Sequence, residues 1–171
     1  DAISFTGYQA GIRTKGIHSK SEIESIDVDR IKENLEQGKI VIVAGFQGIN
    51  ENGDITTLGR GGSDTTAVAL AASLGCNCII YTDVEGIYPV DPKLYPNAKK
   101  IDCIGYKEMI EMSRLGAGVM ETTSVEIGYR KNVPIYVTSS SKDTKGTYIT
   151  GNESTINCKP IIGIAIDNNT S

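Results

Sequence analysis

The sequence has no long apolar run, few cysteines and a single histidine, and each shortage narrows what the protein can be. No stretch approaches the roughly 20 apolar residues of a membrane-spanning helix, and no signal-peptide pattern opens the chain. The four cysteines are scattered, which favours reduced thiols in a cytoplasmic protein. Cys76, Cys78 and the sole histidine, His18, do not match the usual zinc spacings, so we predict no metal site and expect both cysteines to be buried.

Basic residues are also in the minority. The chain has 17 Lys and Arg against 21 Asp and Glu, and this net charge of −4 disfavours nucleic acid as the main partner. The 171 residues, 39% hydrophobic and 22% charged, are typical of a globular domain with a substantial core. Because the chain opens at Asp1 without a Met, in what reads as the middle of a strand, we expect a fragment or processed piece.

Helical and extended patterns alternate along the chain. Apolar residues at helical spacing predict helices, and short continuous apolar runs predict strands buried in a parallel sheet. A polar stretch marked by glycine predicts a hairpin or an excursion of the chain. Ser63 is the expected N-cap of the second helix, and Gly75 its expected stop. The predicted helices cover 28–37, 63–75, 106–115 and 122–131, the predicted strands 40–44, 78–81, 135–137, 146–149 and 161–166, and the hairpin 49–58. This order predicts an α/β fold whose ligands bind in the loops after residues 44 and 81, at the carboxyl ends of the strands.

The strongest local motif is the glycine-rich stretch 56–66, which contains Gly59-Arg60-Gly61-Gly62 and opens directly into a helix. Glycines let the backbone approach a ligand closely, and the N–H groups at a helix N-terminus favour an anion. Arg60 adds a planar fork that suits a carboxylate or a phosphate. The spacing is neither that of a Walker A loop nor that of a dinucleotide fingerprint. On this motif alone, a plain connector or an Arg-Gly-Gly RNA-binding segment stays open as an alternative.

A second polar cluster follows the strand at 78–81. The Thr82-Asp83 pair can hydrogen-bond a base or a ribose, Tyr88 can pack on a base, and Lys93 can reach a phosphate. Asp and Pro in this segment are equally typical of plain turns, so the cluster is weak by itself.

Taken together, these motifs resemble the amino-acid kinase superfamily, and within it the aspartate kinases. The resemblance rests on Gly45-Phe46-Gln47-Gly48, on 56–66, on Thr82-Asp83 with Gly86-Ile87-Tyr88 and Asp91-Pro92, on Ser124-Val125-Glu126 before Val133-Pro134, and on 4–11. It implies a three-layer αβα sandwich with a mostly parallel sheet that lacks its N-terminal part. It also implies a kinase domain over 1–151, with 152–171 as a linker and the first strand of an ACT-like regulatory domain.

The implied activity is phosphoryl transfer from ATP, with Mg²⁺ carried by the nucleotide, to the side-chain carboxylate of L-aspartate. The product is 4-phospho-L-aspartate, in the first step towards lysine, threonine and methionine, and a homo-oligomer without nucleic-acid or membrane partners is expected. The implied catalytic residues are Asp64, Arg60 and Ser63. The implied substrate contacts are Phe46, Gln47, Gly48, Arg60 and Gly61. The implied nucleotide contacts are Gly61, Gly62, Thr82, Asp83, Tyr88, Asp91 and Lys93.

Two departures from the family pattern leave alternatives open. The lysine motif Lys-Phe-Gly-Gly does not occur, and Gly118 stands in Gly116-Ala117-Gly118 where relatives commonly carry a phosphate-binding lysine. Losing one such cation costs on the order of several kcal/mol of transition-state stabilisation. A kinase of another small acid and a catalytically silent nucleotide-binding module are therefore the competing hypotheses.

Overall fold

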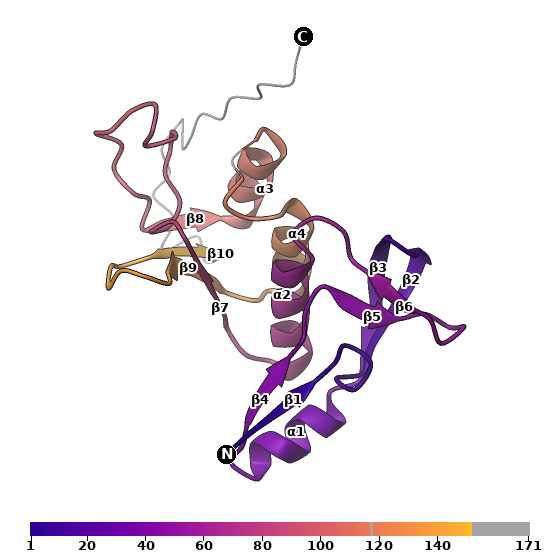
Figure 1. Cartoon of the computed structure of the whole chain (residues 1–171). Coiled ribbons are helices and arrows are strands. Elements are labelled where there is room, and N and C mark those ends of the chain that lie inside the picture. The colour runs from indigo at the N-terminus through magenta and orange to yellow at the C-terminus, as the bar shows by residue number, and fades with distance from the viewer. Residues whose placement is uncertain (117, 152–171) are drawn as a thin grey trace. The chain divides into compact units, whose positions relative to one another are not determined.

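The computed structural model describes residues 1–116 and 118–151, and the chain divides into two compact units, Asp1–Cys76 and Asn77–Ser171 (Figure 1). Each unit combines helices with strands, and each contains parallel strand pairs. The predicted α/β class with largely parallel pairing is confirmed. The strand predicted at 161–166 and the proposed regulatory segment at 152–171 lie outside the described residues.

The first unit contains two small sheets and two helices. Its elements are β1 (Ala2–Phe5), β2 (Ile12–Ile17), β3 (Lys20–Ile26), α1 (Asp29–Glu36), β4 (Ile40–Val43), β5 (Gln47–Ile49), β6 (Ile55–Thr57) and α2 (Gly62–Leu74). Strands β1 and β4 pair in parallel, and the other sheet has the order β3-β2-β5-β6. The predicted hairpin is confirmed as the antiparallel pair β5–β6. The β2–β3 hairpin was not predicted, because charged and small residues interrupt its apolar alternation and its register shifts after Arg13.

The core of the first unit lies on one side of the β1–β4 pair. Buried Phe5, Ile12 and Ile31 form its centre, and Val41 and Val43 of β4 pack against it. The other face of β4 carries Ile40 and Ile42, whose side chains are 66% and 53% exposed. The predicted parallel strand is confirmed, but the prediction that it is buried is wrong, because α1 and the core cover only one face of this short pair.

Over its described residues, 77–116 and 118–151, the second unit contains one four-stranded sheet and two helices. Its elements are β7 (Cys78–Thr82), β8 (Cys103–Gly105), α3 (Tyr106–Arg114), α4 (Thr122–Lys131), β9 (Ile135–Ser139) and β10 (Thr147–Thr150), and the strand order is β7-β9-β10-β8. Ile80, Val137 and Ile149 are buried on one sheet face, whereas Ile79 and Tyr81 of β7 are exposed on the other. Strand β7 is thus parallel as predicted but is also covered on one face only. Strand β8, three residues long, was not predicted.

The C-terminal ends of α2 and α4 follow the expected stop signals. Gly75 and Asn132 both adopt the left-handed conformation at helix C-termini, with φ of 70° and 52°. Cys78 is buried as expected, but Cys76, just after the helix stop, is exposed, so the prediction for that residue is wrong. Among residues 1–116 and 118–151, no helix has the length and apolar character needed to cross a membrane.

We expect Tyr106 to make the stability of the second unit depend on pH in the alkaline range. Its hydroxyl donates a 2.6 Å hydrogen bond to the Val133 carbonyl, and burial raises the pKa of Tyr106 from 10.0 to about 12. The stability that neutral Tyr106 contributes is complete below pH 10 and is lost as the pH rises from 10 towards 12, because only the unfolded chain then releases the proton. We expect Tyr106→Phe to flatten this part of the stability profile, measured by urea unfolding at pH 9 and pH 11. Tyr8→Phe, at an exposed tyrosine, is the control, and an unchanged slope in Tyr106→Phe would contradict the prediction.

Candidate functional site

The glycine-rich loop between β6 and α2 forms a tight turn at the helix N-terminus. Gly59 and Gly61 adopt left-handed φ values of 78° and 64°, and the Gly62 N–H donates to the Gly59 carbonyl at 3.2 Å. Gly61, rather than the predicted Ser63, is the N-cap of α2, because the turn closes two residues earlier than sequence spacing suggested. Ser63 is exposed in the first helical turn, and Asp64 follows it there.

Arg60 lies between these two glycines, at the exposed side of the turn. Within the part of the chain that the structure describes, the guanidinium makes no ion pair. A cation of this kind beside a helix N-terminus is suited to a carboxylate or phosphate ligand.

Phe46 connects the loop after β4 to this turn. It is a non-glycine residue with a positive φ of 70°, a conformation that costs on the order of 1–3 kcal/mol unless its surroundings impose it. The surroundings are specific: the Phe46 N–H donates to Thr66 Oγ1 at 3.0 Å, and the Leu58 N–H donates to the Phe46 carbonyl at 3.0 Å. The Thr66 hydroxyl in turn donates to the Gly62 carbonyl at 2.7 Å. The predicted substrate loop and the glycine-rich turn are therefore built as one structure.

The two residues after Phe46 belong to strand β5. Gln47 pairs with Thr57 and Gly48 with Thr56, so the hairpin carries the chain from one loop to the other. Gly48 is buried, and a Cβ there would lie 2.5 Å from Thr14 Cγ2, so this glycine has a packing role. Its contact with a substrate stays a prediction.

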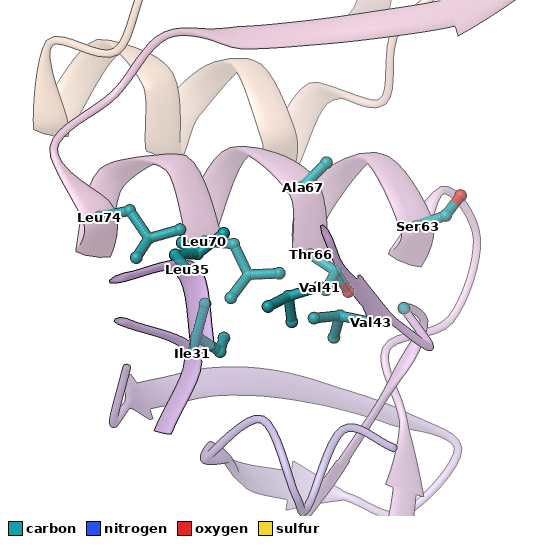
Figure 2. Close-up of a pocket in the computed structure, with 10 residues that line it drawn as sticks. Ile31, Leu35, Val41, Val43, Ser63, Thr66, Ala67, Leu70 and Leu74 are labelled. Atoms are coloured by element: carbon teal, nitrogen blue, oxygen red, sulfur yellow. The ribbon is translucent and has the colours of Figure 1, made fainter. Parts of the chain in front are cut away.

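A cavity of about 390 Å³ lies between α1, β4 and α2 (Figure 2). Its lining residues are Ile31, Leu35, Val41, Val43, Gly45, Ser63, Thr66, Ala67, Leu70 and Leu74. The polar groups, those of Ser63 and Thr66, come from the first turns of α2, and Leu74 lies at the opposite end of the helix (Figure 2). Most of the lining is aliphatic and unsuited to a charged amino acid, so the polar loops beside it form the candidate site.

In the second unit, the predicted nucleotide residues begin at the carboxyl end of β7. Thr82 is in register with Ser139 of the parallel strand β9, and its carbonyl accepts the Ser140 N–H at 2.8 Å. The Thr82 hydroxyl donates to the Asp83 carboxylate at 3.1 Å. This is the sheet edge at which parallel α/β sheets bind ligands.

The segment 83–102 leaves β7, makes a long excursion and returns to β8 (Figure 1). Asp91 and Lys93 lie in this excursion. The Asp91 carboxylate accepts the Lys93 N–H at 2.8 Å, and the Asp91 carbonyl accepts two further N–H groups. Asp91 thus stabilises a turn, and the nucleotide contacts predicted for these two residues stay predictions.

Thr147 links the two ends of the 83–102 segment through hydrogen bonds to Ile87 and Ile101. Its side chain is fully buried, accepts the Ile87 N–H at 2.9 Å and donates to the Ile101 carbonyl at 2.6 Å. We expect Thr147→Val to lower the free energy of unfolding by about 2 kcal/mol, because it leaves two buried backbone groups without this partner. Chemical denaturation measures this loss, and Thr147→Ser, which keeps the hydroxyl, is the control. A valine variant as stable as the serine variant would show that the Thr147 hydroxyl does not contribute to the stability of this segment.

Glu85 gathers side chains from three segments near Tyr88. Its carboxylate lies 2.7 Å from Lys142 Nζ and 4.0 Å from Lys100 Nζ. Hydrogen bonding to Lys142 lowers the pKa of Glu85, and the same contact raises that of Lys142. Burial, and then the nearby Glu85 charge, raise the pKa of Tyr88. Glu85, Lys100 and Lys142 were not predicted as site residues. The sequence signal that could have identified Lys142 is its position directly after three serines at the end of a strand.

The predicted site residues therefore divide between the units. Phe46, Gln47, Gly48, Arg60, Gly61, Gly62, Ser63 and Asp64 belong to the first unit, and Thr82, Asp83, Tyr88, Asp91 and Lys93 to the second. Within residues 1–116 and 118–151, no group of three or more His, Cys, Asp or Glu side chains is placed to hold a metal ion.

Comparison with known proteins agrees with this architecture. Residues 1–139 match the model of the amino acid kinase family. Aspartokinase 2 of Bacillus subtilis is 53% identical over 150 residues, which are 87% of this chain and 37% of that protein. An aspartate kinase of Pseudomonas putida is 49% identical over 168 residues, covering 97% of this chain and 41% of that protein. The chain thus spans about two-fifths of the length of these curated relatives.

A solved structure gives the same result. The crystal structure of E. coli aspartokinase III in complex with aspartate and ADP superposes with a TM-score of 0.75 at 34% identity, covering 88% of this chain and 35% of that one. This chain belongs to the amino acid kinase family, and the members of the family that it resembles are the aspartokinases.

Proposed function

We propose that this chain forms part of an aspartate kinase that transfers the terminal phosphoryl group of ATP to the side-chain carboxylate of L-aspartate. The product would be 4-phospho-L-aspartate, in the first step towards lysine, threonine and methionine. The observation that carries the proposal is the exposed Arg60 between Gly59 and Gly61 at the N-terminus of α2, in a turn joined to Phe46 through Thr66. The E. coli relative that holds aspartate and ADP supports it.

The residues of the first unit are assigned different roles according to their chemistry. Arg60 pairs with a carboxylate of aspartate, the α-carboxylate, through two parallel hydrogen bonds. The N–H group of Gly61 and the Ser63 hydroxyl lie at the start of α2, where developing negative charge is stabilised, while the Gly62 N–H closes the turn on the Gly59 carbonyl. No general base is required, because the nucleophile is a carboxylate that is already ionised near pH 7. Asp64 is assigned an organising role towards cationic side chains.

The second unit would hold the nucleotide. Thr82 and Asp83 are assigned to the base and ribose, and Tyr88 to packing on the base. Mg²⁺ would neutralise phosphate charge when it is bound to the nucleotide. We assign residues 1–151 to the kinase domain.

The test is aspartate-dependent release of ADP from Mg-ATP, with glutamate and carbamate assayed in parallel. It is made on this chain and on any longer natural polypeptide that contains it. Release with aspartate alone supports the proposal. Release with another acid alone would replace the substrate, and binding of nucleotide without turnover in both forms would identify a silent module.

The silent module is the second candidate because of Gly118. This residue is exposed, and a Cβ added to it would meet only the Gly116 carbonyl oxygen, at 4.0 Å. The position that carries a lysine in the family pattern therefore has room for a side chain but lacks one. The phosphate-binding charge must come from elsewhere if the chain is active.

A further inference from the structure

The turn after β9 brings polar groups to the same sheet edge as Thr82. Ser139, which is in register with Thr82, accepts the backbone N–H groups of Ser141 and Lys142 on its hydroxyl oxygen, each at 3.2 Å. The backbone of Lys142 is therefore held at the carboxyl end of the parallel pair β7–β9. Its side chain starts from a defined point beside the residues assigned to the nucleotide.

At this end of the sheet, two cationic side chains face the single carboxylate of Glu85. Two ammonium groups, those of Lys142 and Lys100, share its carboxylate, while the other carboxylate at the strand end, that of Asp83, accepts the Thr82 hydroxyl. Lys100 is largely covered, with 18% of its side chain exposed, whereas 64% of the Lys142 side chain is exposed. Lys142 is thus the one of the two that a ligand in solution can reach.

The Lys142 ammonium also has donors to spare. It carries three N–H groups, and the 2.7 Å contact with Glu85 uses one of them. The remaining donors can bond phosphate oxygens while Glu85 keeps the side chain in place. Burial, and then the nearby Glu85 charge, raise the pKa of Tyr88, so the carboxylate that pairs with the ammonium group also lies near this ring.

We propose that Lys142 binds a phosphate group of the nucleotide and that Glu85 is the positioning residue that holds Lys142 for it. The inference rests on the proposed function, since it names a further nucleotide contact of the same site. It supplies a cation to a site in which Gly118 stands where the family pattern has a lysine. An exposed ion pair adds little to folding stability, so loss of either partner should alter nucleotide binding while leaving the fold intact.

The experiment is a calorimetric titration of the chain with MgATP, MgADP and adenosine. In Lys142→Met we expect affinity for MgATP to fall about tenfold, the effect of losing one charge-assisted hydrogen bond, with adenosine affinity unchanged. Lys142→Arg should restore most of the affinity, and Glu85→Gln should weaken MgATP binding by about threefold. The matched control is Lys145→Met on the same β9–β10 turn, whose ammonium pairs with Asp102 at 3.2 Å and is 68% exposed.

Three outcomes would overturn the proposal, and they differ from one another. MgATP affinity in Lys142→Met within twofold of the unaltered chain would remove Lys142 from the site and leave the proposed function standing. Equal weakening of MgATP and adenosine would show that Lys142 acts on the base or ribose instead. No nucleotide binding by the unaltered chain would overturn both this inference and the proposed function.

Discussion

Replacement of Arg60 by alanine is expected to raise the aspartate concentration needed for half-maximal activity by about a hundredfold, with little change in the requirement for MgATP. The guanidinium is exposed between Gly59 and Gly61, and we assign it a bidentate pair with a substrate carboxylate. Loss of charge-assisted hydrogen bonds of this kind costs about 1.5–3 kcal/mol. Steady-state kinetics with either substrate varied measures the two requirements separately.

Two further variants make the Arg60 test specific. Arg60→Lys keeps the charge but loses the planar fork, so we expect an effect intermediate between those of arginine and alanine. Arg114→Ala removes an exposed arginine of α3 that pairs with Glu126 of α4 at 2.6 Å. It should leave the requirements for aspartate and for MgATP unchanged. An active enzyme whose aspartate requirement does not respond to Arg60→Ala would remove Arg60 from the substrate site.

Replacement of Gly62 by alanine is expected to lower the free energy of unfolding by about 3 kcal/mol and to abolish aspartate binding. A Cβ at this position would lie 2.7 Å from Phe46 Cδ2 and 2.9 Å from Leu58 Cβ. Phe46 cannot move aside easily, because its backbone is held by Thr66 and Leu58 in a left-handed conformation. Chemical denaturation and aspartate titration measure the two effects.

Gly45→Ala is the matched control within the same structure. A Cβ at Gly45 would meet Ser63 Cα and Thr66 Cβ at 3.5 Å, which is ordinary van der Waals contact, and its φ is not in the left-handed region. We expect stability within about 0.5 kcal/mol of the unaltered chain. Equal losses in both variants would show that crowding against Phe46 is not what makes Gly62 necessary.

The local elements could be predicted because their signals are local. The helices over 106–115 and 122–131, the stop at Gly75 and the β5–β6 hairpin all follow from periodicity and from glycine or asparagine at positions that need positive φ. The two site-bearing segments were likewise visible in the sequence, since a glycine-rich turn before a helix and a polar pair after an apolar strand are patterns of neighbouring residues.

The tertiary structure decided the features that depend on residues far apart in the chain. Phe46 adopts a positive φ because Thr66, 20 residues later, accepts its N–H, and no local pattern marks that conformation. Glu85 meets Lys142 across 57 residues because β7 and β9 are parallel neighbours. The exposed faces of Ile40 and Ile79 have the same origin: an apolar run determines that a strand forms, whereas the elements that pack on it determine which of its faces is buried.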